Sequence, residues 1–442
     1  MNSSSDKYLI KFPGGELLYL PREALILDRI KGRTITLHKK KAPSLMLDVK
    51  LQGELSAYKF KPECLTLYIS NICNLNCTYC YIPQKELYPV DSYINESIVE
   101  SGAQIVAKNC RSQNLPFVVG FHGGNEPLLI LKKVESCLKI CHEVASKENV
   151  QLLAYCTTNG VIPEKTAKWA AATFHGITLS WDGHPFFQNN FRKDKSGYET
   201  SDFIERTAKI FIQSQNRPKI ILVRCTITSS SVERMIEITQ YFKSFGVQKV
   251  EYYPVFQNRT KPIPDEMIPD PVKFVYHFIQ AKSFGESCGI EVLFSGSRVR
   301  DYHGRFCSTI QDNLTITPDG YLTNCFQHTQ NYSAQDNLFF YGEYDHDLRQ
   351  LKYDHEKLGR INDIQSYKPT QCSNCFNQFH CSLGCPGICP FNDNFKLNSQ
   401  PDCIKEKWLG LESLLSAAGY NLYQLSEPEL NTFFNAVTYP LI

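Results

Sequence analysis

The strongest constraint on the fold is a regular alternation of two kinds of segment between residues 65 and 290. Six apolar runs, rich in β-branched and aromatic residues, are separated by stretches with the apolar spacing of amphipathic helices. Strands and helices that alternate in this way predict βα units around a mostly parallel sheet. The six runs are residues 65–70, 117–124, 151–160, 176–183, 219–228 and 249–256.

Six units are too few to close an eight-stranded barrel. The predicted fold class is therefore α/β, with a partial (β/α)6 TIM-like barrel over residues 62–290. In parallel α/β folds the chemistry collects where the strands end. The first four runs lead into a cysteine-rich loop and into the segments GGNE, TTNG and SWDG, so we expect the functional site there.

Different sequence patterns flank this region. Residues 1–61 contain short strand-like runs with a hairpin expected around Pro13, and we interpret them as a small accessory module, a candidate for peptide recognition. Residues 291–410 are rich in loops, with a hairpin expected around Gly320. Residues 371–389 have too little periodic apolar content to fold by burial alone, so metal ligation is the expected replacement. Residues 411–442 carry helical signals and are expected to form a C-terminal extension.

Cysteine is the anomaly of an otherwise ordinary composition. With 47 Lys and Arg against 45 Asp and Glu, the formal net charge is +2, so neither nucleic acid nor an anionic membrane is an expected partner. The chain shows no secretion signal and no long apolar stretch, which predicts a cytoplasmic protein. In that reducing compartment, 18 cysteines indicate metal binding rather than disulfides. Seven are scattered through apolar segments and are expected to be mostly buried and inert: Cys64, Cys110, Cys137, Cys141, Cys156, Cys225 and Cys288.

The first cysteine cluster directly follows the first expected barrel strand. Its pattern is Cys73-x3-Cys77-x2-Cys80, with Tyr79 before the last cysteine. Three thiolates on one short loop can hold three irons of a [4Fe–4S] cluster, which leaves the fourth iron open. A zinc site usually has four closed ligands, and this loop would need a remote fourth residue to provide them.

This motif in this context resembles the radical S-adenosylmethionine (SAM) superfamily. The resemblance implies that the open iron chelates the amino and carboxylate groups of SAM. It also implies that one electron from the cluster cleaves the sulfonium bond and produces a 5′-deoxyadenosyl radical, which abstracts hydrogen from the substrate.

Further segments match the family in the expected order. The segment from Gly123 and Gly124 to Glu126 and Pro127 resembles the GGEP motif that contacts the SAM amine, with Asn125 inserted. Residues 157–160 resemble the family's TNG segment, and residues 180–183 resemble its S-x-D-G segment near the ribose. Arg192 lies where relatives often have an arginine that binds the SAM carboxylate, although its flanking residues match only loosely. The implied cofactor-binding residues there are Thr158, Asn159, Ser180, Asp182 and Arg192, together with Tyr79.

The C-terminal cysteines follow the pattern Cys307-x12-Gly320-x4-Cys325, then Cys372-x2-Cys375-x5-Cys381-x3-Cys385, and then Cys403. This array resembles the SPASM domain, an auxiliary-cluster module of peptide-modifying radical SAM enzymes. The resemblance implies one fully ligated [4Fe–4S] cluster and a second that lacks one cysteine ligand, so that the whole chain would hold three clusters. Asp301, His303 or Cys389 could cap the second auxiliary cluster, or its iron could be open. A pair of structural zinc sites is the alternative. The implied ligands are Cys372, Cys375, Cys381 and Cys403 for the first set, and Cys307, Cys325 and Cys385 for the second.

SPASM relatives mostly modify ribosomally made peptides or proteins. We therefore expect a radical SAM oxidoreductase that matures such a peptide by a thioether or carbon–carbon crosslink or by epimerisation, with a reductant such as flavodoxin or ferredoxin. Sulfatase-maturing relatives place an Asp, which acts as the catalytic base, directly after the cysteine that matches Cys325. Here Phe326 occupies that position, which argues against formylglycine formation. That activity and a non-catalytic zinc scaffold remain alternatives. The sequence singles out no general acid or base: Asp182 and Glu251 lie at strand ends and are candidates, with polar lining of the site as the alternative role.

Overall fold

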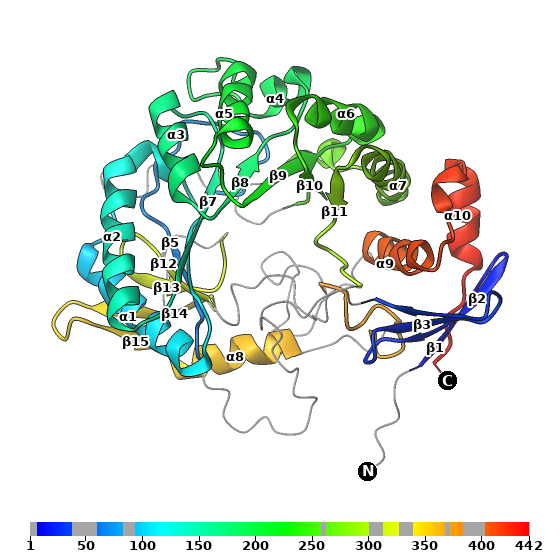
Figure 1. Cartoon of the computed structure of the whole chain (residues 1–442), viewed down its shortest axis with the longest axis horizontal. Coiled ribbons are helices and arrows are strands. Elements are labelled where there is room, and N and C mark those ends of the chain that lie inside the picture. Colours follow the sequence, from blue (N-terminus) through cyan, green and yellow to red (C-terminus); the bar gives the residue numbers. More distant parts are fainter. Residues whose placement is uncertain are drawn as a thin grey trace, which may run out of the picture.

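The computed structural model describes residues 7–37, 60–82, 93–257, 262–299, 313–326, 339–366, 372–382 and 403–441. In this part of the chain, eleven strands form one large sheet in the order β11-β10-β9-β8-β7-β6-β5-β12-β13-β14-β15, and β1 to β4 form a second sheet. Figure 1 shows the large sheet curved into an open arc, with helices along its outer side.

All six predicted barrel strands are present, and each pairs in parallel with the next. The short β11 (Glu291–Leu293) adds a further parallel strand beside β10. Its three residues are too few to show a periodic pattern, so the sequence did not predict it. The six are β5 (Cys64–Leu67), β6 (Phe117–Phe121), β7 (Leu152–Thr158), β8 (Gly176–Ser180), β9 (Ile220–Ile227) and β10 (Lys249–Pro254).

Helices follow the strands and cover the outer face of the arc (Figure 1). α1 begins after Asn95, whose side-chain oxygen accepts a hydrogen bond from the Ser97 amide at 2.9 Å, as expected of an N-cap. α6 ends at Gly246, which adopts the left-handed conformation (φ 82°) that favours glycine at this position. The helices are α1 (Glu96–Gln113), α2 (Leu131–Lys147), α3 (Glu164–Thr173), α4 (Pro185–Phe191), α5 (Ser201–Gln213), α6 (Met235–Phe245) and α7 (Pro271–Cys288).

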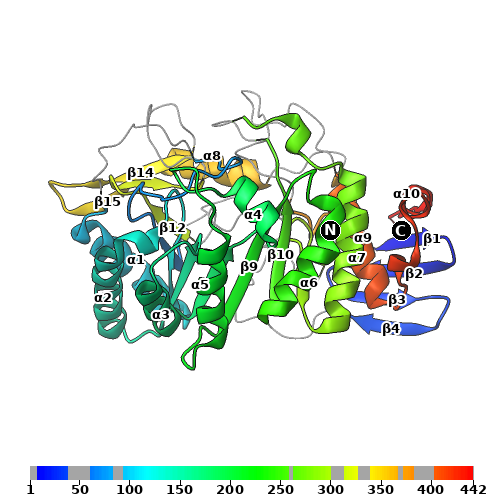
Figure 2. The same cartoon turned by 90° about the horizontal axis from the view of Figure 1, so that it is seen from above.

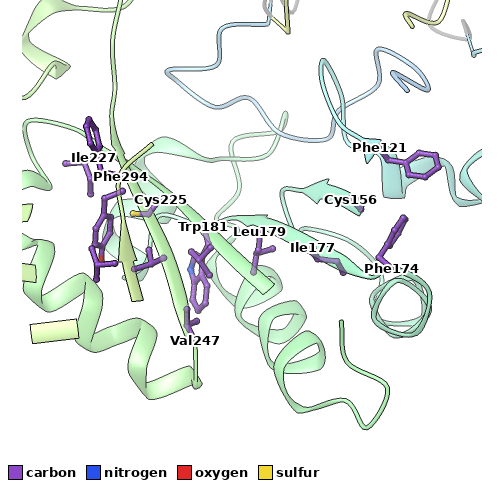
Figure 3. Close-up of a cluster of buried hydrophobic side chains, with 14 of the residues drawn as sticks. Phe121, Cys156, Phe174, Ile177, Leu179, Trp181, Cys225, Ile227, Val247 and Phe294 are labelled. Carbon is purple, nitrogen blue, oxygen red and sulfur yellow. The ribbon is translucent and has the colours of Figure 1, made fainter. Parts of the chain in front are cut away.

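A hydrophobic layer joins the sheet to these helices. Every second strand residue points outward into it, so Ile177, Leu179 and Cys225 are buried there (Figure 3). Trp181 is completely buried, and its ring packs edge-on against Phe242 with the ring centroids 5.0 Å apart. The alternate strand residues face the inside of the arc and include Thr178, Arg224 and Glu251.

The chain after residue 312 continues the same sheet past β5. β12 (Asn313–Ile316) pairs in parallel with β5 and begins the predicted hairpin, which turns at Gly320 (φ 86°) into β13 (Tyr321–Thr323). β14 (Phe340–Asp345) and β15 (Gln350–Tyr353) extend the edge in antiparallel order, and α8 (His355–Ser366) follows.

The two ends of the described chain form one unit. The predicted N-terminal hairpin is present as β1 (Tyr8–Phe12) and β2 (Gly15–Leu20), and β3 (Leu25–Asp28) and β4 (Arg33–Thr36) complete an antiparallel sheet. The Lys11 amide donates to the Thr438 carbonyl at 2.8 Å, so the C-terminal segment pairs with the free edge of β1. Figure 2 shows this sheet beside α9 (Ile404–Ala417) and α10 (Glu427–Ala436).

Membrane insertion through a helix finds no support in the described part of the chain. None of its helices combines the length and the apolar character that spanning a bilayer requires.

Candidate active site

The loop after β5 carries Cys73, Cys77 and Cys80 and is anchored on two sides. On one side, the Glu126 amide donates to the Ile72 carbonyl at 2.9 Å, which ties the loop to the segment after β6. On the other side, the Thr78 amide donates to the Phe191 carbonyl at 3.0 Å, at the end of α4. The loop is therefore fixed across the carboxyl ends of several parallel strands, where a site was predicted.

Asn159 connects the end of β7 to this loop. Its side-chain nitrogen donates to the Asn74 Oδ1 at 2.9 Å and lies 3.7 Å from the Cys73 sulfur. Its backbone amide donates to the Glu126 Oε2 at 2.6 Å. The structure thus brings together three segments that the sequence analysis identified separately.

Glu126 is buried at the centre of this arrangement. Its Oε1 accepts hydrogen bonds from the Thr158 hydroxyl at 2.8 Å and from the Leu128 amide at 3.2 Å. Burial raises the pKa of this carboxyl to about 7, although the hydrogen bonds from Asn159, Thr158 and Leu128 act in the opposite direction. Glu126 also caps the short 3-10 helix Pro127–Ile130.

Two glycines and the inserted asparagine shape the turn before Glu126. Gly123 and Gly124 have φ angles of 101° and 59°, and the ring of Tyr68 fills the space that a Gly123 side chain would need. The Asn125 side-chain nitrogen donates to the Ser70 Oγ at 3.2 Å, so the inserted residue is held against the cysteine loop.

Asp182 and Arg192 lie on the other side of the cysteine loop. The Arg192 Nε donates to the Asp182 Oδ2 at 2.9 Å, and both side chains are buried. The Tyr79 hydroxyl also donates to this carboxylate, and the Arg192 guanidinium lies 5.2 Å from the centroid of the Tyr79 ring. Ser180 ends β8 just before this group, in register with Arg224.

The three loop cysteines fit an iron–sulfur cluster by the chemistry of their surroundings. Burial raises the pKa of the Cys73 and Cys77 thiols to about 11, so a bound cation is needed to keep them as thiolates near neutral pH. The Arg192 cation and the Asn159 amide act in that direction. Within the described residues, no three His, Cys, Asp or Glu side chains converge closely enough to hold a single metal ion, whereas a cluster takes each thiolate on a different iron.

Part of the second cysteine array also gathers in the structure. Cys372 and Cys375 close a turn in which the Cys375 amide donates to the Cys372 carbonyl at 3.1 Å. Burial raises the pKa of the Cys403 thiol to about 11, and the thiols of Cys372 and Cys375 lie close enough to add to the shift. Cys381 follows in the same segment and pairs with Ser297 through an isolated bridge.

Of the second set of proposed auxiliary ligands, Cys325 lies within the described residues. Cys325 is buried just after β13, where its amide donates to the Thr323 hydroxyl at 3.2 Å. Its predicted partners and the residues suggested as a fourth ligand lie outside the described residues: Cys307, Cys385, Asp301, His303 and Cys389.

Two inward-facing residues were missed by the sequence analysis. His122 follows β6 and packs edge-on against Phe326, with ring centroids 4.3 Å apart. Arg224 on β9 donates to the Glu251 Oε2 at 2.6 Å. Burial lowers the pKa of His122 to about 4, and the nearby Arg224 cation adds to the shift. Period-two alternation along β6 and β9 could have placed both residues on the inner face.

The scattered cysteines have the expected structural character. Cys110, Cys137, Cys141, Cys156 and Cys225 are buried, and Cys64 and Cys288 are partly buried. Burial raises the pKa of the Cys110 and Cys137 thiols to about 12, which makes them poor nucleophiles and poor ligands.

One family profile matches the part of the chain that carries this site. Residues 67–237 match the sequence profile of the Radical SAM superfamily. That range begins in β5 and includes the cysteine loop, Glu126, Asn159, Asp182 and Arg192.

Individual relatives are more distant. The chain is 27% identical over 200 residues to a cysteine-type anaerobic sulfatase-maturating enzyme of Clostridium perfringens (strain ATCC 13124), which covers 43% of this chain and 52% of the relative. It is 28% identical over 200 residues to the same enzyme of C. perfringens strain 13, with the same shares covered. The chain therefore spans about half the length of these curated relatives.

Similar solved structures cover more of the chain. The sulfatase-maturating enzyme anSMEcpe with bound AdoMet superposes with a TM-score of 0.60 at 20% identity, over 85% of this chain and 99% of that one. Streptococcus suis SuiB bound to precursor peptide SuiA superposes with a TM-score of 0.50 at 17% identity, over 74% and 71%. At these identities the likeness establishes the fold, an α/β architecture with a large parallel sheet.

Proposed function

We propose that this chain is a radical SAM enzyme that oxidatively modifies a ribosomally made peptide. The observation that carries the proposal is the contact between the cysteine loop and three strand ends, through Asn159, Glu126 and Asp182. Cys73, Cys77 and Cys80 would hold the SAM-binding cluster. When bound, this group supplies the electron that cleaves SAM to a 5′-deoxyadenosyl radical.

The surrounding residues would bind and orient SAM. Glu126 offers a buried carboxyl that gains a full negative charge beside a cationic amine. Arg192 offers guanidinium nitrogens beyond the Nε that Asp182 occupies. Together they offer an acceptor for an ammonium group and a donor for a carboxylate.

An anaerobic preparation tests the cofactor assignment directly. Three [4Fe–4S] clusters require about twelve irons per chain, and reduction in the presence of SAM should release 5′-deoxyadenosine. Replacing Cys73, Cys77 and Cys80 together with Ala should abolish its release and remove about four irons. Cys288→Ala, on α7, is the matched control and should change neither quantity. A wild-type protein with zinc and no iron would instead support the scaffold alternative.

A peptide is the proposed substrate because the inner face of the arc offers mixed polar and aromatic contacts. Arg224 and Glu251 present a donor and an acceptor there, next to Tyr253, whose ring centroid lies 5.1 Å from the Arg224 guanidinium. A peptide backbone needs the same pairing of donors and acceptors. Both anSMEcpe and SuiB have been solved with bound peptides, which supports this substrate class. The auxiliary clusters would accept the electron that the substrate radical loses after hydrogen abstraction. A flavodoxin- or ferredoxin-type reductant would supply the electron that reduces the SAM-binding cluster.

Sulfatase maturation is the second candidate, favoured by the similarity to the C. perfringens enzymes. Phe326 opposes it, because a phenyl ring packed on His122 cannot accept a proton where an aspartate would. The two candidates differ in a single assay. Incubation with a cysteine-containing sulfatase peptide should yield 5′-deoxyadenosine without formylglycine. Formation of formylglycine at more than one turnover would reverse this preference.

The N-terminal module remains a candidate for binding the leader part of such a peptide. Its outer strand β4 is mostly exposed. Deletion of residues 1–37 would also remove the partner of the C-terminal segment, so point changes on β4, such as Thr34→Pro, are the suitable test. Loss of peptide binding with unchanged 5′-deoxyadenosine release would support the assignment.

A further inference from the structure

One lysine lies beside the second cysteine array. Cys403 directly precedes α9, and Lys407 follows one helical turn later, so both side chains lie on the same face of the helix. The Lys407 ammonium is close enough to the Cys403 and Cys375 thiols to interact with both. A lysine side chain carries a positive charge near neutral pH.

Tyr439 holds this lysine in place. Lys407 interacts with the Tyr439 hydroxyl, and its ammonium lies 5.9 Å from the centroid of the Tyr439 ring. The same ring packs edge-on against Phe376, next to Cys375, at a centroid distance of 5.0 Å. Three side chains from separate segments therefore meet beside the cysteines.

The two chain ends fix the position of Tyr439. Its neighbours Thr438 and Pro440 accept hydrogen bonds from the amides of Lys11 and Leu9 on β1, at 2.8 and 3.0 Å. The N-terminal sheet is tied to the cysteine segment itself as well, because Gln378 donates to the Tyr8 hydroxyl. The N-terminal sheet thus helps to hold Tyr439 and the cysteine segment in place.

We propose that Lys407 raises the reduction potential of the auxiliary cluster that Cys372, Cys375, Cys381 and Cys403 would hold, and that Tyr439 positions Lys407. The inference rests on the auxiliary-cluster part of the proposed function. A cluster gains negative charge when it is reduced, so a fixed cation beside it favours the reduced state. The Glu406 carboxylate also lies near the Cys403 thiol, and its negative charge opposes the effect of Lys407. Because Lys407 is half-buried, solvent screens its charge less than it would screen a charge on the surface. An auxiliary cluster with a higher potential accepts the electron from a substrate radical more readily.

Redox titration of the full-length protein, followed by electron paramagnetic resonance, tests this inference without a known substrate. Lys407→Met should shift the midpoint potential of one auxiliary cluster to a more negative value, and Lys407→Arg should retain the wild-type value. Tyr439→Phe should shift it in the same direction by a smaller amount. Lys139→Met removes an equal charge from the exposed face of α2 and should shift nothing. The SAM-binding cluster, recognised by its spectral change on addition of SAM, should keep its potential in every variant.

The possible outcomes separate this inference from the one it rests on. Unchanged potentials in a Lys407→Met protein with full iron content would overturn it, as would an equal shift in Lys139→Met. If Lys407→Met bound less iron than the wild type, Lys407 would be a structural support, and the proposal would survive only if Tyr439→Phe with full iron still shifted the potential. About four irons per wild-type chain would refute the auxiliary clusters themselves.

Discussion

Arg192 and Asp182 form a buried ion pair with an Nε–Oδ2 distance of 2.9 Å. The second carboxylate oxygen of Asp182 accepts a hydrogen bond from the Thr226 amide at 3.0 Å, on β9. Because the Tyr79 hydroxyl donates to the same carboxylate, one aspartate connects β8, β9, α4 and the cysteine loop. The S-x-D-G segment therefore connects the parts of the site, in addition to being a predicted ribose contact.

Removing the arginine should damage both stability and SAM binding. Arg192→Met leaves the Asp182 carboxylate buried without a cation, which we expect to lower the free energy of unfolding by about 3–5 kcal/mol. Arg192→Lys should restore part of this loss, since an ammonium keeps the charge but not the planar geometry. Anaerobic denaturant titration measures the stability, and equilibrium dialysis measures the affinity for SAM. Lys168→Met breaks an exposed pair with Glu164 and should leave both unchanged; equal losses in the two variants would contradict the prediction.

Trp181 determines which way its neighbours point. It is completely buried against α6, so the alternation of side chains turns Ser180 and Asp182 toward the inside of the arc. Trp181→Ala should lower the free energy of unfolding by about 3–5 kcal/mol, because it leaves a large cavity in the core. Trp181→Phe should cost less. Trp169→Ala, at a partly buried position on α3, is the control, and a greater loss there than at Trp181 would refute this account.

Gly123 should tolerate no side chain. A Cβ at this position would lie 1.6 Å from the Tyr68 ring, whereas Gly197, which also has a positive φ angle, has nothing within 4 Å. Gly197→Ala should therefore cost only the strain of its backbone conformation, about 1 kcal/mol. Gly123→Ala should cost more and should lower 5′-deoxyadenosine release, because the turn before Glu126 must move. Tyr68→Leu combined with Gly123→Ala should recover part of the stability if the clash is the cause, and no recovery would point elsewhere.

The fold of residues 62–290 could be predicted because its elements are local. Each strand is a continuous apolar run, and each helix carries a cap or a clear apolar stripe, so the six strands and their order follow from the sequence pattern. The position of β12 beside β5 could not be predicted in this way. It depends on which edge of the arc the later chain meets, and pairing between segments so distant in sequence leaves no periodic signal. The contact between β1 and the C-terminal segment was missed for the same reason.

The site shows a similar division. Motif order along consecutive strands predicted that Glu126, Asn159 and Asp182 would share one edge of the sheet, and the structure brings them to the cysteine loop. His122 and Arg224 belong to no motif, and only the alternation within their strands indicates that they face inward. Lys407 was missed because its proximity to Cys375 results from tertiary packing of α9 against the segment 372–382.

Glu126 should make the stability of the protein depend on pH. Its pKa in the folded state is about 7, compared with an ordinary value of 4.5, so between these pH values the folded chain binds a proton that the unfolded chain does not. The free energy of unfolding should therefore fall by up to about 3 kcal/mol as the pH rises from about 4.5 to about 7, and this contribution should stay constant above that range. Glu126→Gln should lose this part of the slope, as measured by denaturation of the SAM-free protein at pH 5 and pH 8. Glu135→Gln, an exposed change on α2, should follow the wild type at both values. If Glu126→Gln also followed it, the carboxyl would not be the group that titrates.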